Sequence, residues 1–238
     1  MGITTTDLRA LLSLYGITDK DRVADLIATA REARQTPWWK KDFGAIASEQ
    51  YLQFVEFEQT AEEILSYEPL FVPGILQTQE YANVITLDLA RDPAPERLKG
   101  FVVFRLERQK LLRAKQPPKM SFVLDESAVR RLVGSADIMS GQVSHLIDLA
   151  EHSHLSIRIL RFTSGVTYGM QTPFVLMRFP DPADSAVLYF EAPRGSTAVF
   201  DDESEINRYG RSFEQLQRMS LSRRDTVEFL KNLGSEHG

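Results

Sequence analysis

Two arginines in one helix are the residues best suited to bind an anion. Residues 96–114 favour a helix whose inward stripe is otherwise apolar. The stripe consists of Leu98, Phe101, Arg105, Arg108 and Leu112. A guanidinium group on such a face needs an anion, because arginine holds carboxylates and phosphates with two parallel hydrogen bonds. The anion is either Glu126 or Glu191 or a ligand's acid group, unless the helix is simply a solvated cationic face.

Further candidates for ligand or partner binding lie at turns and strand ends. They are Trp38, Trp39, Gln77, Tyr81, Glu126, Arg130, Tyr168 and Glu191. Tyr168 lies between Gly165 and Gly169, in a segment that forms either the lip of a pocket or a plain flexible hairpin. The two tryptophans either anchor a linker to the next domain or stack on a ligand.

The sequence contains few residues that could bind a metal or a cofactor. His152 and His154 could share one strand face near His145, but zinc needs a further ligand, so surface or capping roles are the simpler interpretation. The chain has no cysteine, no G-x-S-x-G and no glycine-rich phosphate loop. We therefore expect no metal and no cofactor, and we assign no catalytic residue, although catalysis without either stays open.

Composition bounds the class of protein. With 238 residues and 43% hydrophobic content, the chain can bury a sizeable core. The net charge of -5 lacks the basic surplus of an autonomous DNA-binding domain. The first residues do not resemble a signal peptide, and no apolar run approaches the ~20 residues of a membrane span. We expect a cytoplasmic protein that does not bind membranes.

The order of the predicted elements indicates two domains. Residues 4–16 and 19–34 favour amphipathic helices, and the run 37–43, which holds both tryptophans, breaks the second helix. We place a domain boundary after residue 43. The two apolar stripes need a partner, which is the rest of the chain, further helices or a second copy in a homodimer.

Residues 44–238 predict an α+β fold, in which helices flank a central, mostly antiparallel sheet. Strands are expected at 63–72, 120–124, 155–162, 174–179, 186–191 and 196–200. Helices are expected from 48, from 78, and at 96–114, 127–132, 138–150, 202–218 and 222–233. The acidic run that opens the helix at 202 suits a helix N-terminus.

Several motifs follow one another in the order of a known family. Residues 70–78 (LFVPGILQT), followed by Tyr81 and Ala82, resemble VPGLLQT-x-x-YA. Arg105, Arg108, Gln109 and Leu112 resemble R-x-x-RQ-x-x-L, and 125–134 resembles DE-x-x-L-R-x-x-V-G. These motifs are similar to the antitoxin-like xenobiotic-response-element (XRE) class of helix-turn-helix regulators from actinobacteria. Residues from about 44 onward resemble its C-terminal domain of unknown function 5753.

The resemblance implies a regulatory role. Residues 1–43 resemble the last two helices of that family's DNA-binding domain, while its first helices, including the recognition helix, have no counterpart in this sequence. DNA binding is expected only if the native protein carries them. The remainder is expected to bind a small-molecule effector or a small partner protein. The alternative is a stand-alone enzyme recruited to a biosynthetic pathway, with Arg105, Glu126, Tyr168 or Glu191 in its site.

Overall fold

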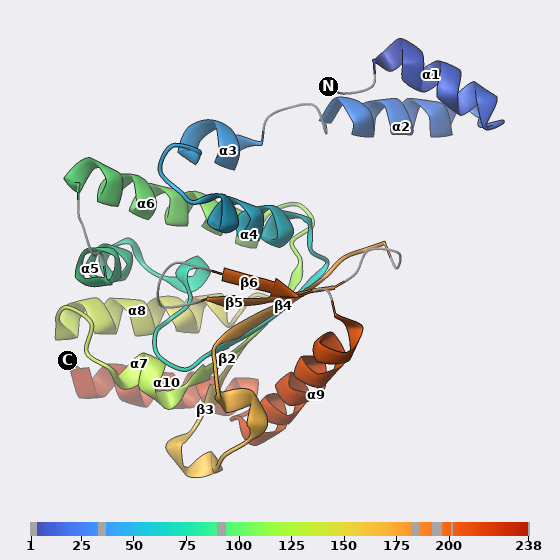
Figure 1. The fold of residues 1–238 in the computed structure, drawn as a ribbon. Coiled ribbons are helices and arrows are strands. Elements are labelled where there is room, and N and C mark those ends of the chain that lie inside the picture. Colours follow the sequence, from blue (N-terminus) through green and yellow to red (C-terminus); the bar gives the residue numbers. More distant parts are fainter. Residues whose placement is uncertain are drawn as a thin grey trace. The chain divides into compact units, whose positions relative to one another are not determined.

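The chain divides into two compact units, Met1–Ala45 and Ile46–Gly238 (Figure 1). This computed structural model describes residues 4–32, 37–89, 94–181, 186–191, 197–200 and 202–237. No helix in these ranges is long and apolar enough to cross a membrane.

The first unit consists of short helices. Helices α1 (Thr5–Leu14) and α2 (Lys20–Glu32) pack together and bury Leu12 and Ile27. Thr4 caps α1 by accepting a hydrogen bond from the Asp7 N–H. The run after α2 was expected only to break that helix, and this expectation was incomplete, because it forms helix α3 (Trp38–Phe43). Proline suits the start of a helix, since its missing N–H would have no helical partner there.

The second unit alternates helices and strands before ending in two helices. In chain order these are α4 (Glu49–Thr60), β1 (Glu63–Glu68), α5 (Gln79–Leu89), α6 (Pro95–Arg108), β2 (Lys119–Asp125), α7 (Glu126–Arg130), α8 (Ala136–Leu149), β3 (Leu155–Leu160), β4 (Phe174–Arg178), β5 (Val187–Glu191), β6 (Thr197–Phe200), α9 (Glu203–Met219) and α10 (Arg223–His237). Short 3-10 turns include η1 (Gly74–Leu76), η2 (Gln109–Arg113), η3 (Phe162–Ser164) and η4 (Tyr168–Met170). The predicted α+β class is confirmed.

The strands form one mixed sheet in the order β3-β2-β1-β4-β5-β6. Strands β1, β2 and β3 are parallel, whereas the pairs β1–β4, β4–β5 and β5–β6 are antiparallel. The parallel pairs need long crossovers, and helices α5 to α8 supply them. The carboxyl ends of β1, β2 and β3 therefore meet at one edge of the sheet, where Asp125 and Leu160 pair in register.

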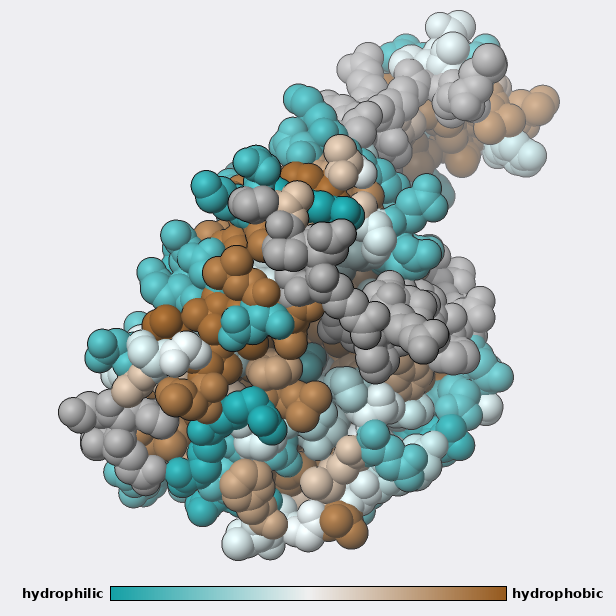
Figure 2. Space-filling view, turned by 60° about the vertical axis from the view of Figure 1, so that its left-hand side comes forward, coloured by the Kyte–Doolittle hydropathy of each residue, from teal (hydrophilic) through white to brown (hydrophobic). Residues whose placement is uncertain are grey.

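Helix α9 covers one face of the sheet, and α4, α5, α6 and α8 gather on the other side (Figure 1). The core under α9 is built from Leu65, Tyr67, Val123, Leu160, Phe174, Leu176, Leu188, Ile206, Tyr209, Phe213 and Leu216. Figure 2 shows hydrophobic residues on the side where α5, α6 and α8 lie. The exposed apolar residues of these helices include Leu87, Leu89 and Val103.

The outer edge of β3 is closed by the turn between α9 and α10. The Leu221 N–H donates to the Ile159 carbonyl at 2.9 Å, and the Thr226 hydroxyl accepts the Ile159 N–H at 3.2 Å. An open strand edge invites pairing with other chains. Here both ladder positions of Ile159 are occupied, and α10 is held against the sheet.

Candidate functional site

Arg108 is buried and paired within the protein. Its Nε and Nη2 donate to the two carboxylate oxygens of Glu58 at 2.9 and 2.7 Å, and both side chains are about 5% exposed. Tyr51 accepts a third bond, and the rings of Tyr51 and Phe54 lie 5.3 and 5.2 Å from the guanidinium carbon. Burial lowers the pKa of Arg108, but Glu58 and Tyr51 outweigh it and raise the pKa above its ordinary value.

Glu126 was therefore wrong as the expected partner of Arg108. The anion is Glu58 of α4, whereas Glu126 binds Arg130 and Arg161. The sequence did contain a sign of this partner. Tyr51, Phe54 and Glu58 are spaced so that they lie on one face of a helix, and Glu58 is the one acidic residue among them. The pair holds α4 against α6, so Arg108 has a structural anion.

Arg105 and its neighbours fasten the loop 72–78, which contains the strongest family motif. Arg105 Nη1 donates to Gln77 Oε1 at 2.8 Å, and Gln77 Nε2 donates to the Val72 carbonyl at 2.7 Å. The Tyr81 hydroxyl accepts the Val72 N–H. Three predicted binding residues, Gln77, Tyr81 and Arg105, thus have their polar groups turned to the loop.

Two glutamines that were not among the predicted binding residues complete this loop. Gln142 of α8 is fully buried, donates to the Leu76 carbonyl and accepts the Thr78 N–H, each at 2.8 Å. Gln109 Nε2 donates to the Gln77 carbonyl at 2.6 Å. Loop backbone groups away from water need such partners. We infer that this motif builds the fold.

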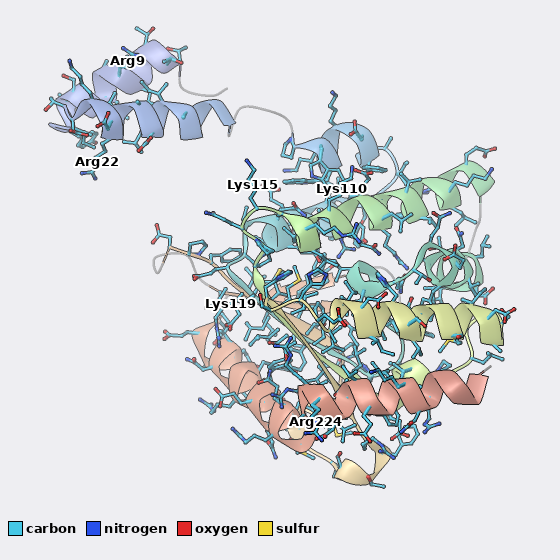
Figure 3. The ribbon with its side chains drawn as sticks, turned by 180° about the vertical axis from the view of Figure 1, so that it is seen from behind. Arg9, Arg22, Lys110, Lys115, Lys119 and Arg224 are labelled. Atoms are coloured by element: carbon cyan, nitrogen blue, oxygen red, sulfur yellow. The ribbon has the colours of Figure 1, made fainter. Side chains whose placement is uncertain are left out.

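The lysines near the end of α6 lie at the surface. Figure 3 shows Lys110 and Lys115 extending from the molecule, and Lys110 pairs with the partly exposed Glu107 at 2.6 Å. The sequence analysis left two interpretations of the basic residues open, an arginine buried with an anion and a cationic face in water. Both occur in the structure, at different residues. Arg108 faces the core, whereas these lysines form a solvated face.

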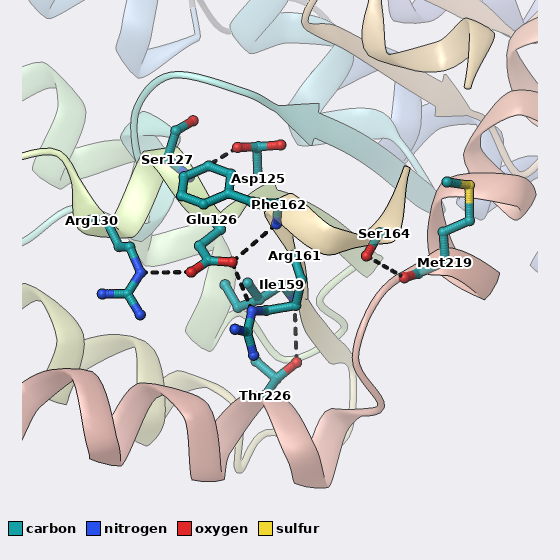
Figure 4. A network of polar contacts seen from close by, with 10 residues as sticks. All are labelled: Asp125, Glu126, Ser127, Arg130, Ile159, Arg161, Phe162, Ser164, Met219 and Thr226. Atoms are coloured by element: carbon teal, nitrogen blue, oxygen red, sulfur yellow. Dashed lines mark hydrogen bonds and ion pairs between the residues drawn. The ribbon is translucent and has the colours of Figure 1, made fainter. Parts of the chain in front are cut away.

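Glu126 lies at the carboxyl edge of the parallel strands, where β2 passes directly into α7 (Figure 4). Asp125 caps α7 by accepting the Ser127 N–H at 2.9 Å. Glu126 accepts from Arg130 Nε at 2.6 Å, from Arg161 Nε at 2.7 Å and from the Phe162 N–H at 3.0 Å. Burial raises the pKa of Glu126, but these three bonds together hold it below its usual range. The carboxylate is charged and fully engaged at neutral pH.

Through Glu126, the segment 161–171 is fastened to the rest of the unit. The guanidinium carbons of Arg130 and Arg161 lie 5.5 and 4.8 Å from the ring centre of Phe229 in α10. Ser164 Oγ donates to the Met219 carbonyl at 3.0 Å. The segment is thus attached to α7, to α10 and to the end of α9, and it is not a plain hairpin.

The segment 161–171 presents apolar side chains to solvent. Phe162, Val166 and Tyr168 are 62%, 90% and 42% exposed. An open cavity of about 540 Å³ is lined by Val166, Thr167, Tyr168, Met170 and Gln171. The Thr167 hydroxyl is buried and has no hydrogen-bond partner within the described part of the chain. Tyr168 is thus one of the residues that line this open cavity.

Helix α9 supplies the floor beneath Tyr168. The Arg208 guanidinium carbon lies 5.0 Å from the centre of the Tyr168 ring, and the Tyr209 ring lies 6.2 Å away. Burial raises the pKa of Tyr209, and its contact with Tyr168 adds to that shift. Neither Arg208 nor Tyr209 was predicted, because both belong to a helix about 40 residues further along the chain.

Gly169 fits the segment closely to α9. A Cβ at this position would lie 3.0 Å from Leu216 Cδ1 and 3.1 Å from Ser212 Cβ. We expect Gly169→Ala to push the segment from the helix and to lower the free energy of unfolding by about 1 kcal/mol. Urea unfolding measures this effect. Gly141→Ala is the control, since nothing lies near its Cβ position, and an equal loss in both variants would contradict the close fit.

The remaining predicted residues are described separately. The rings of Trp38 and Trp39 pack edge to face in the first unit at 5.7 Å, and the side chain of Glu191 lies outside the described residues. His152 and His154 precede β3 instead of lying on it, with ring centres 5.5 Å apart. In the described ranges, no group of three metal-binding side chains occurs.

A second open cavity of about 680 Å³ lies between α4 and the turn that joins β4 to β5. Its lining residues are Gln53, Glu56, Phe57, Thr60, Phe179, Pro180, Asp181 and Val187. It shares no residue with the segment 161–171.

The loop 72–78, the Glu126 contacts and the segment 161–171 all fall within residues 51–232, which match the family described as Domain of unknown function (DUF5753). The chain belongs to the DUF5753 family. Among curated proteins, none matches this sequence. The DUF5753 domain thus covers most of the second unit, and it includes both cavities.

Proposed function

We propose that the DUF5753 domain is the regulatory domain of an XRE-type helix-turn-helix transcriptional regulator. It binds a small-molecule effector or a small partner protein through the segment 161–171. The observation that carries this proposal is the exposure of Phe162, Val166 and Tyr168 on a segment fastened to three helices. Grouped apolar exposure is typical of binding surfaces, and a fastened segment loses little conformational entropy when it binds.

The first unit supports a connection to DNA. The end of helix α1 leaves Leu14 and its C-cap Tyr15 exposed, as expected of a helix that packs against further elements. Arg9 and Arg22 extend from α1 and α2 (Figure 3), where they can neutralise phosphates. In a regulator that carries the full set of DNA-binding helices, binding at the segment 161–171 changes DNA affinity in the cytoplasm, and self-association through the helices gives a homodimer.

The alternative of a small-molecule enzyme is not favoured by a specific contact. Arg105 and Glu126, which such an enzyme would use, already bind Gln77 and the two arginines. We therefore carry the regulatory function forward.

The test measures transcription in the native host. Deletion of the gene is expected to change transcript levels of its target genes. Val166→Asp places a charge on the exposed segment at little cost in stability, and it is expected to abolish the response to the effector or partner. Leu132→Asp is the matched control, since Leu132 is exposed outside the segment. Unchanged transcripts after deletion would refute the regulatory function, and a normal response with Val166→Asp would remove the segment from it.

A further inference from the structure

The cavity in the segment 161–171 is open to solvent and has the volume of a small-molecule site. Its volume of about 540 Å³ falls in the range of roughly 300–1,000 Å³ that is usual for ligand pockets. Tyr168 and Met170 offer an aromatic face and a thioether, which both pack well against flat rings. Gln171 adds a polar side chain to the lining. The lining thus suits a planar ring with polar substituents.

Arg208 places a cation beside this aromatic wall. Its guanidinium lies over the Tyr168 ring, and its Nη2 binds Glu205 at 2.5 Å. Glu205 uses only part of a group with five donors, and the Arg208 side chain is about half exposed. A carboxylate or sulfonate on a ligand can reach the remaining donors, and it would compete with Glu205 for the guanidinium.

The cavity is formed before any ligand binds. The Met170 N–H donates to the Thr167 carbonyl at 3.1 Å, and the Gln171 N–H donates to the Tyr168 carbonyl at 3.3 Å. Gly169 lies so close to α9 that a Cβ there would come within 3.0 Å of Leu216. A site held in this way does not need to be ordered by its ligand.

We propose that this cavity binds a small aromatic anion. The ring lies against Tyr168 and Met170, and the acid group lies at Arg208. The proposal rests on the regulatory function of the segment 161–171, and it gives the effector a chemical class. Neither family membership nor the sequence motifs assign such a site.

The experiment titrates the full chain with 8-anilinonaphthalene-1-sulfonate, an aromatic anion whose fluorescence reports binding. N-phenyl-1-naphthylamine, its neutral analogue, measures binding through the ring alone. We expect one saturable site for the anion. Arg208→Gln should weaken anion binding about 10-fold, as expected for loss of a charge-assisted hydrogen bond, and should leave the neutral analogue unchanged. Tyr168→Ala should weaken both.

Two further variants sharpen the test. Glu205→Gln removes the competing carboxylate, so anion binding should tighten by about 3-fold. Arg211→Gln is the matched control, because Arg211 is an exposed arginine on the same helix but, unlike Arg208, does not lie over the Tyr168 ring. Its affinity should equal that of the unmodified chain. Thermal unfolding of each variant checks that the fold is kept.

Three results would overturn the proposal. They are equal losses with Arg208→Gln and Arg211→Gln, weaker anion binding with Glu205→Gln, and unsaturable binding that Tyr168→Ala does not change. The two proposals fail separately. If the anion does not bind but Val166→Asp abolishes the transcriptional response as expected, only the ligand class is refuted. Unchanged transcription after deletion of the gene refutes only the regulatory function.

Discussion

Replacing Arg108 with alanine is expected to lower the free energy of unfolding by about 3–5 kcal/mol, the usual cost of removing one partner of a buried ion pair. Glu58 would stay buried without the guanidinium that binds both of its oxygens. Its carboxylate must then take up a proton or admit water. The rings of Tyr51 and Phe54 would also lose the cation that packs on them. Urea unfolding at neutral pH measures the loss.

A double variant separates the charge from the packing. Glu58→Leu with Arg108→Met replaces both partners by apolar groups, and such replacements are often neutral or stabilising. We expect it to recover most of the stability lost in Arg108→Ala. Lys110→Ala is the control, because its pair with Glu107 is exposed and should change stability by less than about 1 kcal/mol. A double variant as unstable as Arg108→Ala would show that the charges themselves are required.

The strands and most helices could be predicted because their signals are local. Alternating apolar residues located β3, and Ser48, Thr78 and Asp202 stand at the starts of helices. Such patterns need only a few neighbouring residues. The sheet class followed from the order of these elements.

The end of β1 could not be predicted from its apolar run. Apolar residues continue from Leu70 to Val72, yet the strand ends at Glu68. Beyond that point Pro69 accepts a bond from Ser127, and the Val72 N–H binds Tyr81. These partners come from α7 and α5, so tertiary contacts decide where the strand stops.

The candidate site was predicted in part. Glu126 and Tyr168 were recognised by their place between elements, but Arg161, Thr167 and Arg208 were missed. Arg161 follows β3, and Arg208 lies on α9. Their contacts arise only when β2 and β3 end side by side and α9 packs beneath the segment 161–171. No local spacing encodes that arrangement.

Glu126→Gln is expected to lower the free energy of unfolding by about 2–3 kcal/mol at pH 7, since Arg130 and Arg161 lose their common charged acceptor. The loss is smaller than for Arg108, because both arginines are more than one third exposed and water can solvate them. The amide keeps the shape of the carboxylate and one acceptor oxygen. The difference therefore reports the charge of Glu126, and urea unfolding measures it.

The same variant predicts a pH dependence with a definite sign. The pKa of Glu126 is lowered in the folded protein, so its carboxylate stabilises the fold fully above the ordinary glutamate pKa of about 4.3. That contribution is lost as pH falls through the lowered folded pKa. The stability gap between the unmodified chain and Glu126→Gln should thus be constant above about pH 5 and should shrink in acid. Glu214→Gln is the control, because its contact with Arg218 is 3.7 Å long and exposed. A gap that stays constant down to pH 3 would contradict a role for the charge, since only the ionised form distinguishes glutamate from glutamine at this position.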